Sequence, residues 1–243
     1  MEVSLKNKII LVTGGTGGLG QSFVRTFAGE NARVIFTYLT HEDRARNLEK
    51  LGARAFYVNL ADRNSVKKFT EQIKKEFPRL DGIIHCAGIS RDHTIAKLTE
   101  EEFDESIEVN LTAIFRMSVD LLPLLEKSVL PKIINVVSRT GIYGNFGQIA
   151  YSASKAGLIS LTKSMAEEWG VKKILVNAIT PGYLMSDMTH DLPEEIHERA
   201  RKQSYLGIVS DQDEVAEFAA YLMSDHMKKI TGQIFHYDTR RNP

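Results

Sequence analysis

The chain has 243 residues, of which 43% are hydrophobic and 26% charged, and its 31 basic side chains balance 31 acidic ones. This composition is typical of one α/β domain with a sizeable core, and it excludes the basic excess of most nucleic-acid-binding proteins. No stretch reaches the roughly 18 apolar residues that a membrane-spanning helix needs. The first residues lack the pattern of a secretory signal, and the single cysteine, Cys86, permits no intrachain disulfide, so we expect a cytoplasmic protein.

Short β-branched runs alternate with longer amphipathic patterns from residue 8 to residue 180. Because the runs are almost continuously apolar, we expect parallel strands that are buried on both faces. The alternation predicts an α/β fold with a doubly wound parallel sheet, in one domain over residues 1–243. The predicted strands lie at residues 9–13, 33–37, 55–58, 82–85, 133–137 and 174–178. Helices are predicted from Leu19, near Glu42, near Asp62, over 99–125 after the capping box Thr99–Glu102, and over 150–169.

A glycine-rich turn, TGGTGGLG, occupies residues 13–20, directly after the first predicted strand. Glycines allow the backbone to turn sharply and to approach a ligand closely, and the helix that follows presents free N–H groups to a phosphate. The position between a strand and a helix makes a dinucleotide-binding turn the favoured interpretation over an unliganded tight turn. The residues expected to contact the cofactor here are Gly14, Thr16, Gly17, Gly18, Leu19 and Gly20.

The end of the second predicted strand indicates which dinucleotide binds. A carboxylate at this position bonds the ribose 2′-hydroxyl of NAD, whereas NADP requires a site without negative charge. The strand ends at Thr37, and the first acid after it is Glu42. We therefore expect NADP(H), with NAD(H) as the alternative, and His41 and Arg44 as the basic candidates for the 2′-phosphate.

A tyrosine and a lysine, Tyr151 and Lys155, lie four residues apart at the start of a predicted helix and therefore on one face of it. Ser138 follows the preceding strand, so all three side chains should reach the crevice at the carboxyl ends of the strands. An ammonium near a phenol favours the phenolate and lowers the phenol pKa. This pattern predicts that Tyr151 is a general acid tuned by Lys155, and that Ser138 hydrogen-bonds the substrate oxygen.

With these motifs the chain resembles the short-chain dehydrogenases/reductases over nearly its whole length. Within that family it is most similar to the 3-oxoacyl-(acyl-carrier-protein) reductases, through YSASKAGLISLTKSMAEEWG from Tyr151 and VNAITPGYLMSDMT from Val176. The resemblance implies a Rossmann-type fold and hydride transfer between a nicotinamide cofactor and a ketone or alcohol. It rests on Thr13, Gly14, Gly18, Gly20, Ala87, Gly88, Asn110, Ser138, Tyr151, Lys155, Pro181 and Gly182.

The resemblance also implies roles for single residues. Asn110 would complete a catalytic tetrad by fixing a water for proton relay to Lys155, which would also hold the nicotinamide ribose, and Ser186 would contact the carboxamide. The sequence departs from the family where Cys86 replaces an asparagine, where Asn59 replaces an acid, and where Thr239 and Arg240 replace two glycines. The other cofactor contacts implied are Asn59, Leu60, Cys86, Ala87, Gly88, Tyr151, Pro181, Gly182 and Leu184.

We therefore expect an NADPH-dependent carbonyl reductase acting on a ketone such as a 3-oxoacyl thioester, with acyl-carrier protein as a candidate carrier of the substrate. The alternatives are an NAD-dependent dehydrogenase of an alcohol, sugar or steroid, and a cofactor-binding regulator without catalysis. No metal is expected, because His85, His93 and His190 lack the spacing of metal ligands. We also expect a homotetramer, and a substrate lid at about residues 185–210 whose helix, Pro193–Lys202, belongs to a segment with apolar Met185, Met188, Leu192 and Ile196.

Overall fold

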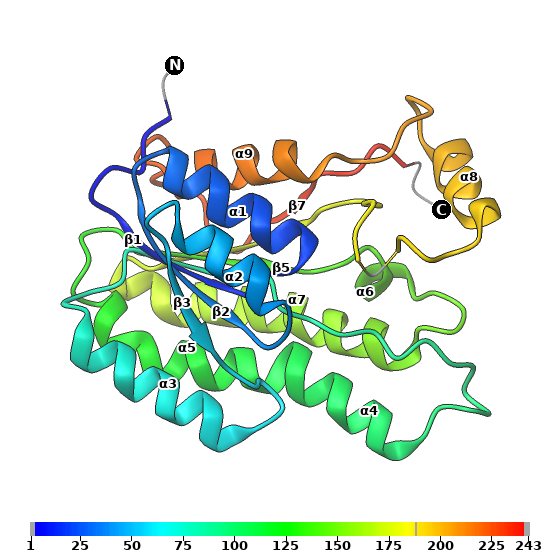
Figure 1. Ribbon diagram of the computed structural model, residues 1–243, viewed down its shortest axis with the longest axis horizontal. Coiled ribbons are helices and arrows are strands. Elements are labelled where there is room, and N and C mark those ends of the chain that lie inside the picture. Colours follow the sequence, from blue (N-terminus) through cyan, green and yellow to red (C-terminus); the bar gives the residue numbers. More distant parts are fainter. Residues whose placement is uncertain (1–2, 188, 241–243) are drawn as a thin grey trace.

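A computed structural model describes residues 3–187 and 189–240 as one α/β domain (Figure 1). Its sheet has seven strands, all parallel, in the order β3-β2-β1-β4-β5-β6-β7. The strands are β1 Ile9–Thr13, β2 Arg33–Tyr38, β3 Arg54–Tyr57, β4 Gly82–His85, β5 Lys132–Val136, β6 Leu175–Thr180 and β7 Ile234–His236.

Helices cover both faces of the sheet, as Figure 1 shows, with α1, α2 and α9 on one side and α3, α5 and α7 on the other. β1 shows why both faces need cover: Ile9 and Leu11 pack into one core, and Ile10 and Val12 pack into the other. The helices are α1 Gly18–Gly29, α2 Glu42–Glu49, α3 Arg63–Glu76, α4 Glu100–Ile107, α5 Ala113–Leu125, α6 Thr140–Tyr143, α7 Ile149–Trp169, α8 Glu194–Gln203 and α9 Gln212–Met223.

The predicted sheet is confirmed, because each predicted strand is present with ends shifted by two residues or fewer. The sequence pattern missed β7, a three-residue strand at the sheet edge with no fully buried residue. The helix predicted over residues 99–125 starts at its capping box but is interrupted by a π-helical turn, η1 Glu108–Thr112. The lid helix begins at Glu194, with Pro193 as its N-cap residue.

The order of the strands determines where a ligand can bind. β1 lies between β2 and β4, so the chain leaves β1 toward one edge of the sheet and returns to build the other half from β4. Ligands of open α/β sheets bind at such a switch point, beyond the carboxyl ends of the strands. The glycine turn after β1 and the segment after β4 meet there, and Ser138 follows β5 at the same edge.

A buried lysine, Lys132, ties β5 to the end of α9 at the opposite edge of the sheet. Its Nζ donates hydrogen bonds to the carbonyl oxygens of Leu222, Ser224 and Met227, and the side chain is 4% exposed. We expect Lys132→Met to lower the free energy of unfolding by about 1.5–3 kcal/mol, because it leaves these carbonyls without a charged donor. Urea denaturation measures the loss. Lys8→Met removes a surface ion pair with Asp225 and should cost less than about 1 kcal/mol; equal losses in the two variants would contradict this account.

Candidate active site

The glycine turn after β1 packs tightly against the protein at Gly14, Gly15, Gly18 and Gly20 and is open at Gly17. Gly14 has a φ of +70°, and a Cβ on it would lie 2.8 Å from the Cα of Ala87. A Cβ on Gly20 would lie 2.0 Å from the carbonyl oxygen of Gly14. A Cβ on Gly17 would meet only that oxygen, at 3.5 Å. The side of the turn at Gly17 is therefore open for a ligand to approach.

The N-terminus of α1 continues from this open side. Gly17 is its N-cap residue, and within the described chain no side chain caps the first turn and no acid lies in it. The first N–H groups of a helix have no intrahelical acceptor and favour an anion. The backbone at Gly18 and Leu19 thus fits the pyrophosphate of a dinucleotide, the group that the sequence predicts here.

Thr37, predicted to lie at the adenosine ribose, is bonded to the glycine turn. Its Oγ1 accepts a hydrogen bond from the Gly14 N–H at 3.2 Å, and its carbonyl oxygen accepts one from the Gly15 N–H at 2.8 Å. The side chain is 2% exposed. Thr37 therefore braces the turn, and the choice between cofactors depends more on the residues that follow it.

Arg44 is the basic side chain that the structure brings to the turn. Its Nη1 donates to the carbonyl oxygen of Thr16 at 3.2 Å, and the Thr16 hydroxyl donates to the carbonyl oxygen of Thr40 at 2.9 Å. The guanidinium also forms an ion pair with Asp187. His41, the other candidate, is exposed and has a φ of 60° before α2.

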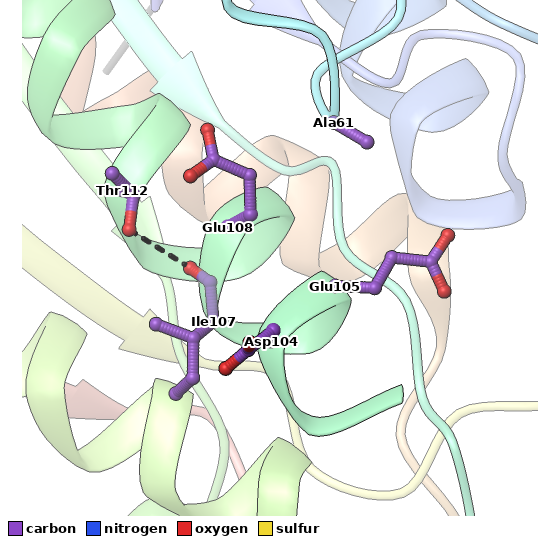
Figure 2. A pocket seen from close by; sticks show the side chains of 6 residues that line it. All are labelled: Ala61, Asp104, Glu105, Ile107, Glu108 and Thr112. Carbon is purple, nitrogen blue, oxygen red and sulfur yellow. Dashed lines mark hydrogen bonds between the residues drawn. The ribbon is translucent and has the colours of Figure 1, made fainter. Parts of the chain in front are cut away.

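Asn59 and Leu60 follow β3 on the adenosine side of the switch point. The Asn59 Oδ1 accepts a hydrogen bond from the Ala61 N–H at 3.0 Å, so this amide stabilises its own turn. Leu60 is buried. A surface hollow of about 470 Å³ lies beside the turn, and Figure 2 shows the side chains that line it, which are Ala61, Asp104, Glu105, Ile107, Glu108 and Thr112.

This hollow is separate from the predicted catalytic residues. Its acids come from α4 and η1, and two of them are paired, Glu105 with Arg91 and Glu108 with Arg116. Ala61, which follows Asn59 and Leu60, lines its other side. None of Asn110, Ser138, Tyr151 and Lys155 lines it, so it is not where the predicted chemistry takes place.

Asn110 lies in the π-helical turn η1 and is fully buried. Its Oδ1 accepts from the Ile89 N–H at 2.8 Å, and its Nδ2 donates to the Ile89 carbonyl oxygen at 2.9 Å and to Ser154 Oγ at 3.0 Å. π-helical turns inside helices are frequent at functional sites. The asparagine thus joins the segment after β4 to the helix that carries Tyr151 and Lys155.

Lys155 reaches the same point from α7. Its Nζ donates to the carbonyl oxygen of Val136 at 2.8 Å, and the side chain is 3% exposed. A Cβ on Gly88 would lie 3.4 Å from Lys155 Nζ and 3.2 Å from Asn110 Oδ1. The glycine therefore leaves space beside the ammonium, and burial lowers the pKa of Lys155 to about 8.

Ser138 lies close enough to the Tyr151 phenol to act on its pKa, and the Tyr151 ring centroid lies 5.6 Å from Lys155 Nζ. Burial raises the pKa of Tyr151 to about 12, against the lowering effect of the nearby Ser138. Removal of the phenol from water is the largest cause of this rise, and the expected tuning of Tyr151 by Lys155 stays a prediction. Tyr151 is a protonated donor at neutral pH.

The segment after β6 closes the other side of the crevice. Gly182 has a φ of +77°, and a Cβ on it would lie 2.2 Å from Ser210 Oγ. Leu184, buried, pairs with Ser210 in an isolated β-bridge. The Ser186 N–H donates to Thr189 Oγ1 at 2.9 Å. Pro181 and Gly182 thus lie just before the predicted lid, and Ser210, at its far end, contacts the segment that leads into it.

Cys86 lies in the turn after β4, where its N–H donates to Thr13 Oγ1 at 3.1 Å. Burial raises the pKa of its thiol to about 12, although Lys155 acts in the opposite direction. Such a thiol stays protonated and is a poor nucleophile. This agrees with the interpretation of Cys86 as a small packed residue.

Three contacts of the site were missed in the sequence. Thr13 Oγ1 also accepts from the Ala87 N–H at 3.1 Å, Ser154 connects Asn110 to the Tyr151 carbonyl oxygen, and Thr140 bonds Ser138 Oγ through its own hydroxyl at 3.1 Å. The position of Ser154 could have been predicted from the sequence, because a residue three positions after Tyr151 lies on the same face of the helix. The contacts of Thr13 and Thr140 depend on how the chain folds.

Metal-binding clusters and membrane-spanning helices are both absent from residues 3–187 and 189–240. No group of three or more histidine, cysteine, aspartate or glutamate side chains in these ranges could hold a metal ion. No helix in the same ranges is long and apolar enough to cross a membrane.

Comparison with known proteins agrees with this geometry. The sequence model of the family described as Enoyl-(Acyl carrier protein) reductase matches residues 14–239. A 3-oxoacyl-[acyl-carrier-protein] reductase FabG of Thermotoga maritima is 36% identical over 96% of this chain and 97% of its own. The enzyme of the same name from Escherichia coli is 34% identical over 96% and 97% of the two chains.

A solved structure, that of gox2181, superposes with a TM-score of 0.91 and 26% identity, over 98% of this chain and 96% of the other. The segment matched by the family model contains the five glycines of the turn, Asn110, Ser138, Tyr151 and Lys155. The chain therefore belongs to the short-chain dehydrogenase/reductase family, as an oxidoreductase related to the 3-oxoacyl-[acyl-carrier-protein] reductases.

Proposed function

We propose that this protein is an NADPH-dependent ketoreductase that reduces the ketone of a 3-oxoacyl thioester. The observation that carries the proposal is the proximity of Tyr151 and Ser138, with Lys155 on the same helix as Tyr151 and the glycine turn at the same edge of the sheet. The relatives named as 3-oxoacyl-[acyl-carrier-protein] reductases support this substrate class.

Each residue of the pair has a distinct role in the reduction. The bound nicotinamide supplies the hydride. Ser138 donates a hydrogen bond to the ketone oxygen and orients it, and Tyr151 gives that oxygen its proton as negative charge develops. With its raised pKa, Tyr151 is protonated at neutral pH, the form that gives a proton in reduction.

Lys155 and Asn110 support this pair. The Lys155 ammonium, beside Gly88, would hold the nicotinamide ribose and stabilise the phenolate left after proton transfer. The Asn110 amide is committed to Ile89 and Ser154, so it fixes the shape of the site. The water relay that the family implies at Asn110 stays a prediction.

NADPH is the proposed cofactor because the crevice has a basic side chain at the adenosine end. Arg44 contacts the Thr16 carbonyl oxygen in the glycine turn, and no acid follows the end of β2 at Tyr38 before Glu42. A guanidinium binds phosphate through paired N–H donors. Arg44 is therefore the proposed ligand of the 2′-phosphate.

The segment from residue 185 to residue 210 is proposed as a substrate lid. Of its predicted apolar side chains, Met185, Leu192 and Ile196 are exposed, and Met188 lies outside the described residues. Because these apolar side chains are exposed and not packed against the sheet, they are available to contact the acyl chain of a substrate.

A homotetramer is proposed as the assembly and the cytoplasm as the location. Phe115 and Val119 of α5 are exposed apolar side chains one helical turn apart, which suits packing against a second copy of this helix. Size-exclusion chromatography with light scattering measures the number of subunits.

The test of the function is a cofactor-oxidation assay with a panel of thioesters. We expect NADPH to be consumed with a 3-oxoacyl thioester and not with the matching 2-enoyl thioester, because the Tyr151 and Ser138 hydroxyls are arranged for a carbonyl oxygen. Side-by-side assays with NADH, and with a sugar and a steroid ketone, separate the alternatives. Reduction of the enoyl compound alone, or no turnover with any substrate, would overturn the proposal.

A further inference from the structure

Arg44 connects three segments that are far apart in the sequence. It starts from α2, donates to Thr16 in the glycine turn at 3.2 Å, and forms a two-pronged ion pair with Asp187 at the start of the proposed lid. The longer prong, from Nη2 to Asp187 Oδ1, measures 3.3 Å. The first residues of the lid are thus held against the adenosine end of the cofactor crevice.

The chemistry of this pair resembles that of a guanidinium with a phosphate. A carboxylate presents two oxygens to the guanidinium in the same fork geometry as two phosphate oxygens. The hydrogen bond from Arg44 is the main cause that lowers the pKa of Asp187, so the carboxylate is ionised at neutral pH. The other charged groups acting on the pair are Asp43, His41 and His190.

We propose that Asp187 competes with the 2′-phosphate of the cofactor for Arg44, so that binding of NADPH, but not of NADH, releases the start of the lid. This inference rests on the proposed function, in which Arg44 binds the 2′-phosphate. It adds Asp187, which lies 143 positions from Arg44 in the sequence, as a residue that determines cofactor specificity.

The two anions exclude each other for electrostatic reasons. Asp187 occupies both terminal nitrogens of the guanidinium, which are also the donors that a phosphate needs. A phosphate dianion beside the carboxylate would repel it. NADH carries a hydroxyl at this position and leaves the ion pair intact. Both side chains are partly exposed, at 30% and 48%, so the competition is modest and sensitive to salt.

The test measures binding rather than turnover. We expect Asp187→Asn to lower the Kd for NADPH by roughly two- to fivefold, the effect of removing one exposed ion pair, and to leave the Kd for NADH unchanged. Adenosine 2′,5′-bisphosphate and adenosine 5′-monophosphate, compared by calorimetry, isolate the 2′-phosphate and should show the same contrast. Asp191→Asn removes an equal charge from the same segment, where Asp191 pairs with His190, and should change neither ligand.

A double-mutant cycle shows whether the effect acts through Arg44. In an Arg44→Gln background, Asp187→Asn should have no further effect on NADPH. Amide exchange over residues 184–187 should rise when adenosine 2′,5′-bisphosphate is added and stay constant with the monophosphate. The competition would be overturned if Asp187→Asn left the ratio of NADPH to NADH affinity unchanged, or if its effect persisted without Arg44. In either case, NADPH binding by the wild type would still support the proposed function. A wild type that binds neither cofactor would overturn both.

Discussion

Tyr151→Phe should lower kcat by about 10²-fold or more, the usual contribution of a positioned acid or base. Only the phenolic oxygen is lost, because the ring keeps its place on α7 beside Lys155. The glycine turn and its backbone donors are untouched, so the Kd for NADPH should stay within about twofold. Stopped-flow measurement of NADPH oxidation with a saturating 3-oxoacyl thioester gives the rate, and fluorescence titration gives the affinity.

The matched control is Tyr221→Phe, which removes a phenolic oxygen from α9. Tyr221 lies near the end of α9 that Lys132 contacts, at the edge of the sheet opposite the crevice. It should turn over at the wild-type rate. If Tyr151→Phe bound NADPH normally and also kept near wild-type turnover, Tyr151 would not be the acid, and Ser138 or a water would have to supply the proton.

Much of the fold follows from patterns that are local in the sequence. Strands such as β1 and β5 are continuous apolar runs, and only a sheet covered on both faces can bury them. Their parallel order places Ser138 and the start of α7 at one edge, which is why a serine and a tyrosine from different elements could be predicted to meet. In the structure Ser138 lies near enough to Tyr151 to act on the pKa of its phenol, while the catalytic roles of both residues stay predictions.

The remaining features depend on contacts that no local pattern records. The π-helical turn at Asn110 interrupts a helix whose apolar periodicity predicts continuity. The commitment of Thr37 to the Gly14 N–H depends on how β2 packs beside the glycine turn. The pKa of Tyr151 depends on burial, a property of the finished structure, and the sequence showed only the nearby ammonium.

The glycine turn offers a way to separate a ligand's needs from the needs of the fold. At Gly20 the fold itself requires a glycine, because a Cβ there would lie 2.0 Å from the Gly14 carbonyl oxygen. Gly20→Ala should therefore destabilise the protein, and its effect on ligand binding could not be measured separately. At Gly17 the protein leaves space, since the nearest atom to an added Cβ is the same oxygen at 3.5 Å and φ is −70°. A loss of affinity on substitution of Gly17 can then come only from the ligand.

Gly17→Ala should therefore keep the wild-type urea midpoint while weakening NADPH binding by about tenfold or more, since a methyl group on the open side of the turn would take space from a pyrophosphate bound there. Gly29→Ala at the end of α1 is the control, because a Cβ there meets nothing within 4 Å. It should change neither affinity nor, beyond a small gain in helix propensity, stability. Unchanged NADPH affinity in a folded Gly17→Ala variant would show that the pyrophosphate does not lie on this turn, whereas loss of stability would show that the turn itself needs the glycine. The proposed site requires the affinity to fall while the stability stays at the wild-type value.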